Sequence, residues 1–186
     1  EITLSCEKTG LEHALTQEDT SRVLHTLLAL PQGVQAMNVD FPGLVQTSLN
    51  LGVMGMEEDG LRFRLSVRSC IASQKSMMVQ RVRAILELGG GTAVEVSRYP
   101  GWQYARQSVL REDVLAAYQA VSGREGRIDA THGGLECGLF LEKIPGLDAI
   151  SLGPEIHDAH STAEKLSAPS TQRVYEVVRE LLKRSH

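Results

Sequence analysis

Two runs of alternating side chains, residues 45–53 and 61–67, constrain the fold more than any other part of the sequence. In both runs, apolar residues or threonine alternate with polar residues or glycine, a period of two that is typical of a strand with one buried face. The intervening segment, residues 57–60, is rich in turn-forming residue types. The two runs therefore predict an antiparallel hairpin. Its second strand carries Arg62, Arg64 and Arg68 on the face opposite its apolar side chains.

Two helices are expected around this hairpin. Residues 16–19 have the form of a capping box, in which threonine opens the helix and aspartate stands three residues later. Apolar residues at helical spacing follow until Pro31. A second helix is predicted over about 74–88, ending at a run of three glycines that readily adopt a left-handed cap. A strand over 92–97 would complete this unit.

The pattern changes beyond residue 103 to helices alternating with short strands. Ser108 is positioned to cap one helix, and Ser170 is expected to open the last one. Short strands are predicted at 127–131 and 148–152, and each leads directly into a loop that contains histidine. Functional loops of α/β sheets lie at the carboxyl ends of strands. The expected fold class is therefore α/β (α+β), with a domain boundary near residue 103.

Composition excludes several classes of protein. The 186 residues are enough for one large or two small domains, and 42% hydrophobic with 23% charged residues is typical of a globular chain. Lys and Arg number 19 against 23 for Asp and Glu, so a sequence-independent nucleic-acid binder is not expected. The apolar runs are far shorter than the ~20 residues that span a bilayer, so no membrane partner is expected either.

The cysteines and the first residue also carry information. Cys6, Cys70 and Cys137 are far apart and form no CxxC motif, which indicates a protein of the reducing cytosol rather than a disulfide scaffold or a zinc ribbon. The sequence starts with Glu1 rather than methionine. The expectation is therefore a piece of a longer, cytoplasmic protein.

A glycine-rich segment, residues 132–138, is the first candidate site. Its three glycines allow the backbone to approach a ligand closely, and Glu136 could hold an ammonium group. The alternative is a tight turn from strand to helix, with Glu136 at the helix N-terminus. Cys137 could be a nucleophile, but no distinctive motif surrounds it.

Two further candidates are His160 and Arg68. His160 lies in a loop with His157 and Asp158, and imidazole is the commonest protein ligand for zinc. This loop alone lacks the spacing of a four-ligand structural zinc site, so a solvated surface histidine is the alternative. Arg68 could bind a carboxylate through two parallel hydrogen bonds. The alternative for Arg68 is a solvated strand face.

Several blocks together resemble one family, in order and in spacing. They are similar to the C-terminal half of aminoacyl-histidine dipeptidases, also called Xaa-His or carnosine-hydrolysing dipeptidases, which are two-metal peptidases. The most specific feature is the pairing of a glycine-rich block with a later histidine block. The matching blocks are SLNLGV (48–53), VRSCIAS (67–73), YPGW (99–102), HGGLECGLF (132–140), SLGP (151–154) and His160-Ser161 with Glu164.

The resemblance implies an architecture for the two halves of the chain. Members of the family have a catalytic α/β zinc-peptidase domain that is interrupted by an α+β lid domain, which often forms the dimer. Residues 1–103 would be the C-terminal part of the lid, and residues 104–186 the C-terminal part of the catalytic domain. The implied partners are a dipeptide substrate and a second copy bound through the lid.

The resemblance also implies roles for individual residues. His160 corresponds to a metal ligand, Arg68 to the arginine that binds the substrate carboxylate, and His132 and Glu136 to the substrate-binding loop. The family block reads HSPDE where this chain has His160-Ser-Thr-Ala-Glu164, which leaves the shape of the loop open. The other metal ligands, the general base and a lid histidine would lie upstream of Glu1. No catalytic residue is therefore expected in this chain.

The implied activity is that of a metallodipeptidase that hydrolyses Xaa-His dipeptides. Two divalent metal ions, with zinc the expected metal, would activate a water molecule for attack on the peptide carbonyl. A lone imidazole holds catalytic zinc weakly, so this chain is expected to be inactive by itself. Two alternatives remain open: a dipeptidase or amidohydrolase of the same superfamily with another specificity, and a non-enzymatic module that dimerises through the first half of the chain.

Overall fold

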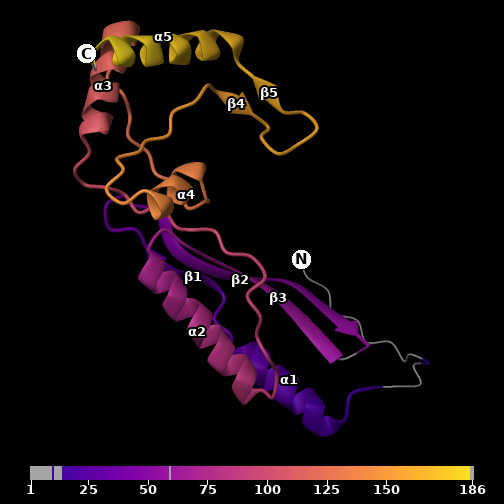
Figure 1. Cartoon of the computed structure of the whole chain (residues 1–186). Helices are drawn as coiled ribbons and strands as arrows, with labels where there is room; N and C mark the ends of the chain where they lie inside the picture. The colour runs from indigo at the N-terminus through magenta and orange to yellow at the C-terminus, as the bar shows by residue number, and fades with distance from the viewer. Residues whose placement is uncertain (1–9, 11–13, 59, 185–186) are drawn as a thin grey trace.

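The computed structural model describes residues 10, 14–58 and 60–184 (Figure 1). Helices and strands are mixed, as the predicted α/β (α+β) class requires. The elements fall into two groups along the chain, a sheet packed with two helices and then three helices with a short β-ribbon. In chain order they are α1 (Gln17–Ala29), β1 (Gly33–Met37), β2 (Val45–Glu57), β3 (Gly60–Ser69), α2 (Ala72–Leu88), α3 (Val109–Ser122), α4 (Glu136–Lys143), β4 (Ile156–His157), β5 (Lys165–Leu166) and α5 (Ala168–Arg184).

The first sheet has the order β1-β2-β3, and both pairings are antiparallel. The β2–β3 hairpin is confirmed, although Asp59 of its predicted turn lies outside the described residues. The strand β1 was not predicted. It pairs along the opposite edge of β2, so β2 is the central strand.

A β-bulge interrupts the predicted alternation of β2. The register shifts between Leu51 and Val53, so that Leu51 faces Leu65 whereas Val53 faces Arg64. Beyond the bulge, the side chains of β2 have exchanged faces. Val53 is consequently 55% exposed instead of continuing the apolar face that the sequence predicted.

The two faces of the sheet differ in what covers them. Helices α1 and α2 lie along one face, where Leu30, Leu49, Met78 and Val82 form the buried core. The β3 arginines alternate with the apolar residues of that strand and therefore project from the other face. We call this other face, which carries Ser48, Arg62, Arg64 and Arg68, the arginine face.

The predicted helix caps are largely confirmed. The Thr16 hydroxyl accepts a hydrogen bond from the Asp19 amide at 3.0 Å, and the Ser108 hydroxyl accepts one from the Arg111 amide at the same distance. Ser170 was predicted to open the last helix, but that helix begins two residues earlier, at Ala168. The Ser170 hydroxyl is buried and donates to the Ser167 carbonyl, so the helix has already begun when the chain reaches Ser170.

Three predicted strands are wrong: within the described residues, 92–97, 127–131 and 148–152 form no strand. These segments have strand-like composition, but a strand also requires a neighbouring backbone to accept and donate its hydrogen bonds. The described part of the chain places no such neighbour beside them. Val94 and Val96 are accordingly 81% and 87% exposed.

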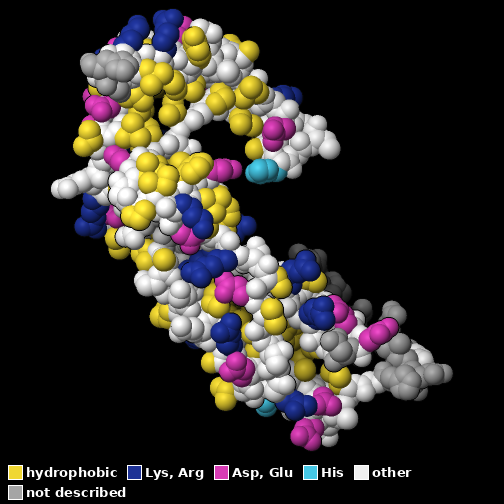
Figure 2. All heavy atoms as spheres, viewed as in Figure 1, with side chains coloured by type: hydrophobic (Ala, Val, Ile, Leu, Met, Phe, Trp, Pro, Cys, Tyr) yellow, Lys and Arg dark blue, Asp and Glu magenta, His cyan; other side chains and the backbone are white. Residues whose placement is uncertain are grey.

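The second group of elements buries little apolar surface. Helices α3 and α5 pack against each other through Val114, Ala117 and Val177. Other large apolar side chains of this group are exposed, including Phe140, Tyr175 and Leu182. Figure 2 shows hydrophobic side chains gathered on the surface of this end of the molecule. Among the residues described, no helix combines the length and the apolar character needed to cross a membrane.

The bulge gives a direct test of which β2 positions support the core. Leu49→Ala, at a position that is 1% exposed, should lower the free energy of unfolding by about 2–4 kcal/mol because it leaves a cavity. Val53→Ala, four residues later on the same strand, should cost less than about 0.5 kcal/mol. Urea unfolding of both variants measures the difference. Equal losses would contradict the register described above.

Candidate functional site

The arginine face of the sheet meets the glycine-rich loop at Ser48. The Ser48 hydroxyl and Nε2 of His132 are 2.7 Å apart, a hydrogen bond between residues 84 positions apart in the sequence. Ser48 of β2 stands directly opposite Arg68 of β3 in the sheet register, so their side chains share the face. Two of the predicted site residues, Arg68 and His132, are therefore brought together, and Ser48 connects them.

The surroundings of His132 favour its neutral form. Burial lowers the pKa of this imidazole below the usual histidine value, and the positive charge of Arg68 lowers it further. The backbone of Val45 opposes the shift, but Nδ1 makes no hydrogen bond of good geometry within the described residues. At neutral pH the ring is therefore uncharged. It presents one donor and one acceptor nitrogen, and the Ser48 hydroxyl can serve either tautomer at Nε2.

The rest of the loop is packed against Tyr99. A Cβ atom at Gly134 would lie 2.4 Å from the Tyr99 ring, so only glycine allows this contact. Glu136 is exposed in the first turn of α4, and α4 has no side-chain cap at Leu135. Burial and the negative charge of Glu136 both raise the pKa of the Tyr99 hydroxyl. The predicted turn into a helix is thus present, and the carboxylate of Glu136 remains open to solvent.

Cys137 makes a structural contact between two segments of the chain. The residue is half-buried in α4, and its thiol donates a hydrogen bond to the Ile150 carbonyl at 3.7 Å. This contact links the helix to the segment that precedes the histidine loop.

His160 lies in the loop between β4 and β5. It is exposed and adopts a left-handed backbone conformation with φ of 65°, which is uncommon for a residue other than glycine. Its backbone N–H donates to the Glu164 carboxylate at 2.8 Å, and the Ser161 hydroxyl donates to the Asp158 carbonyl at 2.7 Å. This chain has Thr162 and Ala163 where the family block has proline and aspartate. The hydrogen bonds of Ser161 and Glu164 therefore shape the loop without those two residues.

The described residues do not form a metal centre. Within residues 10, 14–58 and 60–184, no group of three or more His, Cys, Asp or Glu side chains is close enough together to hold a metal ion. In this part of the chain, no described contact joins His160 to Arg68, His132 or Glu136. The described residues supply one exposed imidazole, His160, at the predicted metal position, and a single ligand does not hold a metal ion by itself. Cys6 and His13 lie outside the described residues.

Two residues of the site were not selected from the sequence alone. Ser48 and Tyr99 both lie in blocks that carry the family resemblance, SLNLGV and YPGW, and this was the available signal. A serine on a strand and a tyrosine in a loop show no distinctive spacing, because their partners are far away in the sequence. Only the packing of the loop against the sheet reveals their role.

Comparison with known proteins confirms the resemblance. No protein-family profile matches the sequence. The cytosol non-specific dipeptidase of Escherichia coli (strain K12) is 33% identical over 170 residues, which are 91% of this chain and 35% of the relative. The crystal structure of aminoacylhistidine dipeptidase from Vibrio alginolyticus matches with a TM-score of 0.78 and 34% identity, over 91% of this chain and 34% of that one.

A more distant structure shows the same fold. Aminopeptidase PepT from Bacillus cereus matches with a TM-score of 0.66 and 19% identity, over 88% of this chain and 45% of that one. The chain spans about a third of the length of the two dipeptidases. It is thus similar over most of its own length to part of a dipeptidase, and the predicted resemblance to aminoacyl-histidine dipeptidases holds.

The electrostatic effect of Arg68 on His132 can be tested by titration. Arg68→Gln removes a positive charge beside the ring, so the pKa of His132 should rise toward the usual histidine value. Arg64→Gln, on the same face of the same strand, is the matched control and should leave the titration unchanged. NMR titration of the His132 ring protons measures both variants.

The sign of the pH dependence follows from the lowered pKa. The unfolded chain binds the His132 proton more readily than the folded chain does. The contribution of neutral His132 to stability is therefore complete above the usual histidine pKa and is lost as the pH falls from that value through the lower pKa of the folded state. An unchanged pKa in Arg68→Gln, or an equal rise in Arg64→Gln, would contradict the arrangement.

Proposed function

We propose that this chain is the substrate-recognising portion of a dipeptidase of the aminoacyl-histidine type. The single observation that carries the proposal is the 2.7 Å contact of Ser48 with His132, on the sheet face from which Arg68 projects. Arg68 lies opposite Ser48 in the sheet register, and its positive charge helps to lower the pKa of His132, which supports a carboxylate-binding role for this face. The similarity to two dipeptidases over 91% of the chain supports the same conclusion.

In this proposal, the charges at the two ends of a dipeptide are recognised by different elements. Arg68 binds the C-terminal carboxylate with two parallel hydrogen bonds. Neutral His132 adds one hydrogen bond and no second positive charge. Glu136, which is exposed at the start of α4, binds the free α-ammonium group. A site with one fixed charge at each end selects dipeptides against longer peptides.

Preference for histidine in the second position is part of the proposal. The family blocks and the aminoacylhistidine dipeptidase from Vibrio alginolyticus support it. The name of the Escherichia coli relative, a non-specific dipeptidase, describes a broader range of substrates for that protein. A dipeptidase with another side-chain preference is therefore the direct competitor of the Xaa-His proposal.

Catalysis would require residues outside this chain. The family resemblance implies two divalent metal ions, zinc by expectation, whereas the described residues supply His160 alone at that position. We therefore assign His160 as one contributor to a metal site that the parent protein completes, and we assign no catalytic residue to this chain. The 186-residue chain is proposed to be inactive on its own.

The two halves of the chain would have different roles in the parent. Residues 1–103 are proposed as the C-terminal part of a lid through which two copies dimerise, and residues 104–186 as the C-terminal part of the catalytic domain. The exposed apolar side chains around α4 and α5 would then be covered by the rest of that domain. A cytoplasmic location is proposed as well, supported by the name of the cytosolic relative.

Hydrolysis assays test the proposal at two levels. The purified 186-residue chain should not cleave Ala-His when zinc, manganese or cobalt is added, because one imidazole cannot hold the metal. The full-length parent should cleave Ala-His and should prefer it to Ala-Leu. Amino-acid release, followed by chromatography, measures both activities.

The control is the parent with His160→Ala, which should lose metal and activity together. Metal-dependent cleavage by the 186-residue chain would contradict the predicted inactivity. A parent that cleaves Ala-Leu as fast as Ala-His would contradict the Xaa-His specificity.

A further inference from the structure

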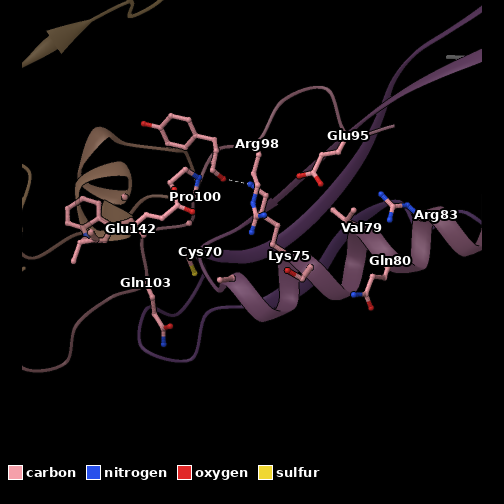
Figure 3. A pocket seen from close by; sticks show the side chains of 17 residues that line it. Cys70, Lys75, Val79, Gln80, Arg83, Glu95, Arg98, Pro100, Gln103 and Glu142 are labelled. Atoms are coloured by element: carbon pink, nitrogen blue, oxygen red, sulfur yellow. Dashed lines mark hydrogen bonds between the residues drawn. The ribbon is translucent and has the colours of Figure 1, made fainter. Parts of the chain in front are cut away.

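A groove lies outside the arginine face. It has a volume of about 480 Å³ and lies between α2, the segment 95–103 and α4 (Figure 3). Ser48, Arg68, His132 and Glu136 do not line it, whereas Tyr99 and Gly138 border both the groove and the glycine-rich loop. The groove therefore adjoins the glycine-rich loop, but none of the four side chains proposed to bind the dipeptide lines it.

The walls of this groove are held in close contact. A Cβ atom at Gly101 would lie 2.5 Å from the Ser69 carbonyl oxygen, and one at Gly138 would lie 3.2 Å from the Pro100 carbonyl oxygen. Glycine at these two positions lets segment 95–103 pack directly against the end of β3 and against α4. These backbone contacts hold the walls of the groove together.

Charged side chains of both signs line the groove. The basic ones are Lys75, Arg83 and Arg98, and the acidic ones are Glu95 and Glu142. In the described part of the chain, no ion pair involves any of these five residues. In Figure 3, Lys75, Arg98 and Glu95 gather on one side of the groove, and Glu142 lies across from them beside Pro100. Opposite charges therefore face one space without neutralising each other directly.

Lys75 is the most constrained of these groups. It is half-buried, and its ammonium donates a hydrogen bond to the Tyr99 carbonyl. Burial lowers the pKa of Lys75, and the like charge of Arg98 lowers it further, while Glu95 and Glu142 act in the opposite direction. An anionic group placed between Lys75 and Arg98 would relieve the repulsion between these two cations.

We propose that this groove binds a free α-amino acid. Its carboxylate would lie between Lys75 and Arg98, its ammonium group would face Glu142, and its side chain would rest against Trp102 and Leu141, which line the same space. A purely anionic ligand would meet the two glutamates, and a purely cationic one would meet the basic side chains. A zwitterion matches both sets of charges. The inference rests on the groove alone and does not require the proposed dipeptidase function.

The chain contains a single tryptophan, Trp102, and it lines the groove. Its indole resonance and its fluorescence therefore report on this site directly. Titration of the 186-residue chain with L-leucine should shift the Trp102 indole N–H signal until it saturates. N-acetyl-leucine, which lacks the ammonium group, and leucine amide, which lacks the carboxylate, should each bind about tenfold more weakly.

Substitutions in the groove test where the amino acid binds. Arg98→Gln and Glu142→Gln change exposed side chains, so the fold should persist, and each should weaken leucine binding by about tenfold. Arg179→Gln on α5 and Glu58→Gln in the β2–β3 turn are the matched controls and should bind normally. Arg68→Gln should also bind normally, which separates this site from the proposed dipeptide site.

Three results would overturn the inference. They are the absence of any saturable shift of Trp102, equal binding of N-acetyl-leucine and leucine, and loss of binding in Arg68→Gln with normal binding in Arg98→Gln. None of these results bears on whether the parent hydrolyses dipeptides, so the inference can fail while the proposed function stands.

Discussion

The hydrogen bond between Ser48 and His132 is the contact on which the candidate site depends. It joins the central strand of the sheet to a loop 84 residues later, and these two parts belong to different groups of elements. Without it, the guanidinium of Arg68 would be one of several arginines on a solvated strand face. With it, Arg68 stands beside a neutral imidazole and a glycine-rich backbone, a combination that suits a carboxylate.

The register of the sheet decides which arginine takes this position. Ser48 and Arg68 lie opposite each other before the bulge, where the alternation of β2 matches that of β3. Beyond the bulge, Arg64 faces an exposed valine and Arg62 faces Gly55. The three arginines of this strand face therefore have different surroundings, although their alternating positions in the sequence are equivalent.

Local features were predictable from the sequence, and features that depend on distant partners were not. The hairpin and the caps at Thr16 and Ser108 depend on neighbours within a few residues, so the sequence contains the complete signal. The segments 92–97, 127–131 and 148–152 have strand-like residues, but no described strand pairs with them. For the same reason, composition could not select Ser48 or Tyr99. The family motifs selected Arg68, His132, Glu136 and His160. Among the described residues, the hydrogen bond of Ser48 with His132 and the sheet register bring Arg68 and His132 to one face, and no described contact adds the other two.

The most direct measurement of the central claim is discrimination between a dipeptide and its C-terminal amide by the full-length parent. If Arg68 binds the substrate carboxylate, kcat/KM for Ala-His should exceed that for Ala-His amide by at least about tenfold, and Arg68→Gln should abolish the difference. Arg64→Gln, on the same strand face, should retain it. Full discrimination in Arg68→Gln would contradict the account, because the carboxylate would then be recognised elsewhere.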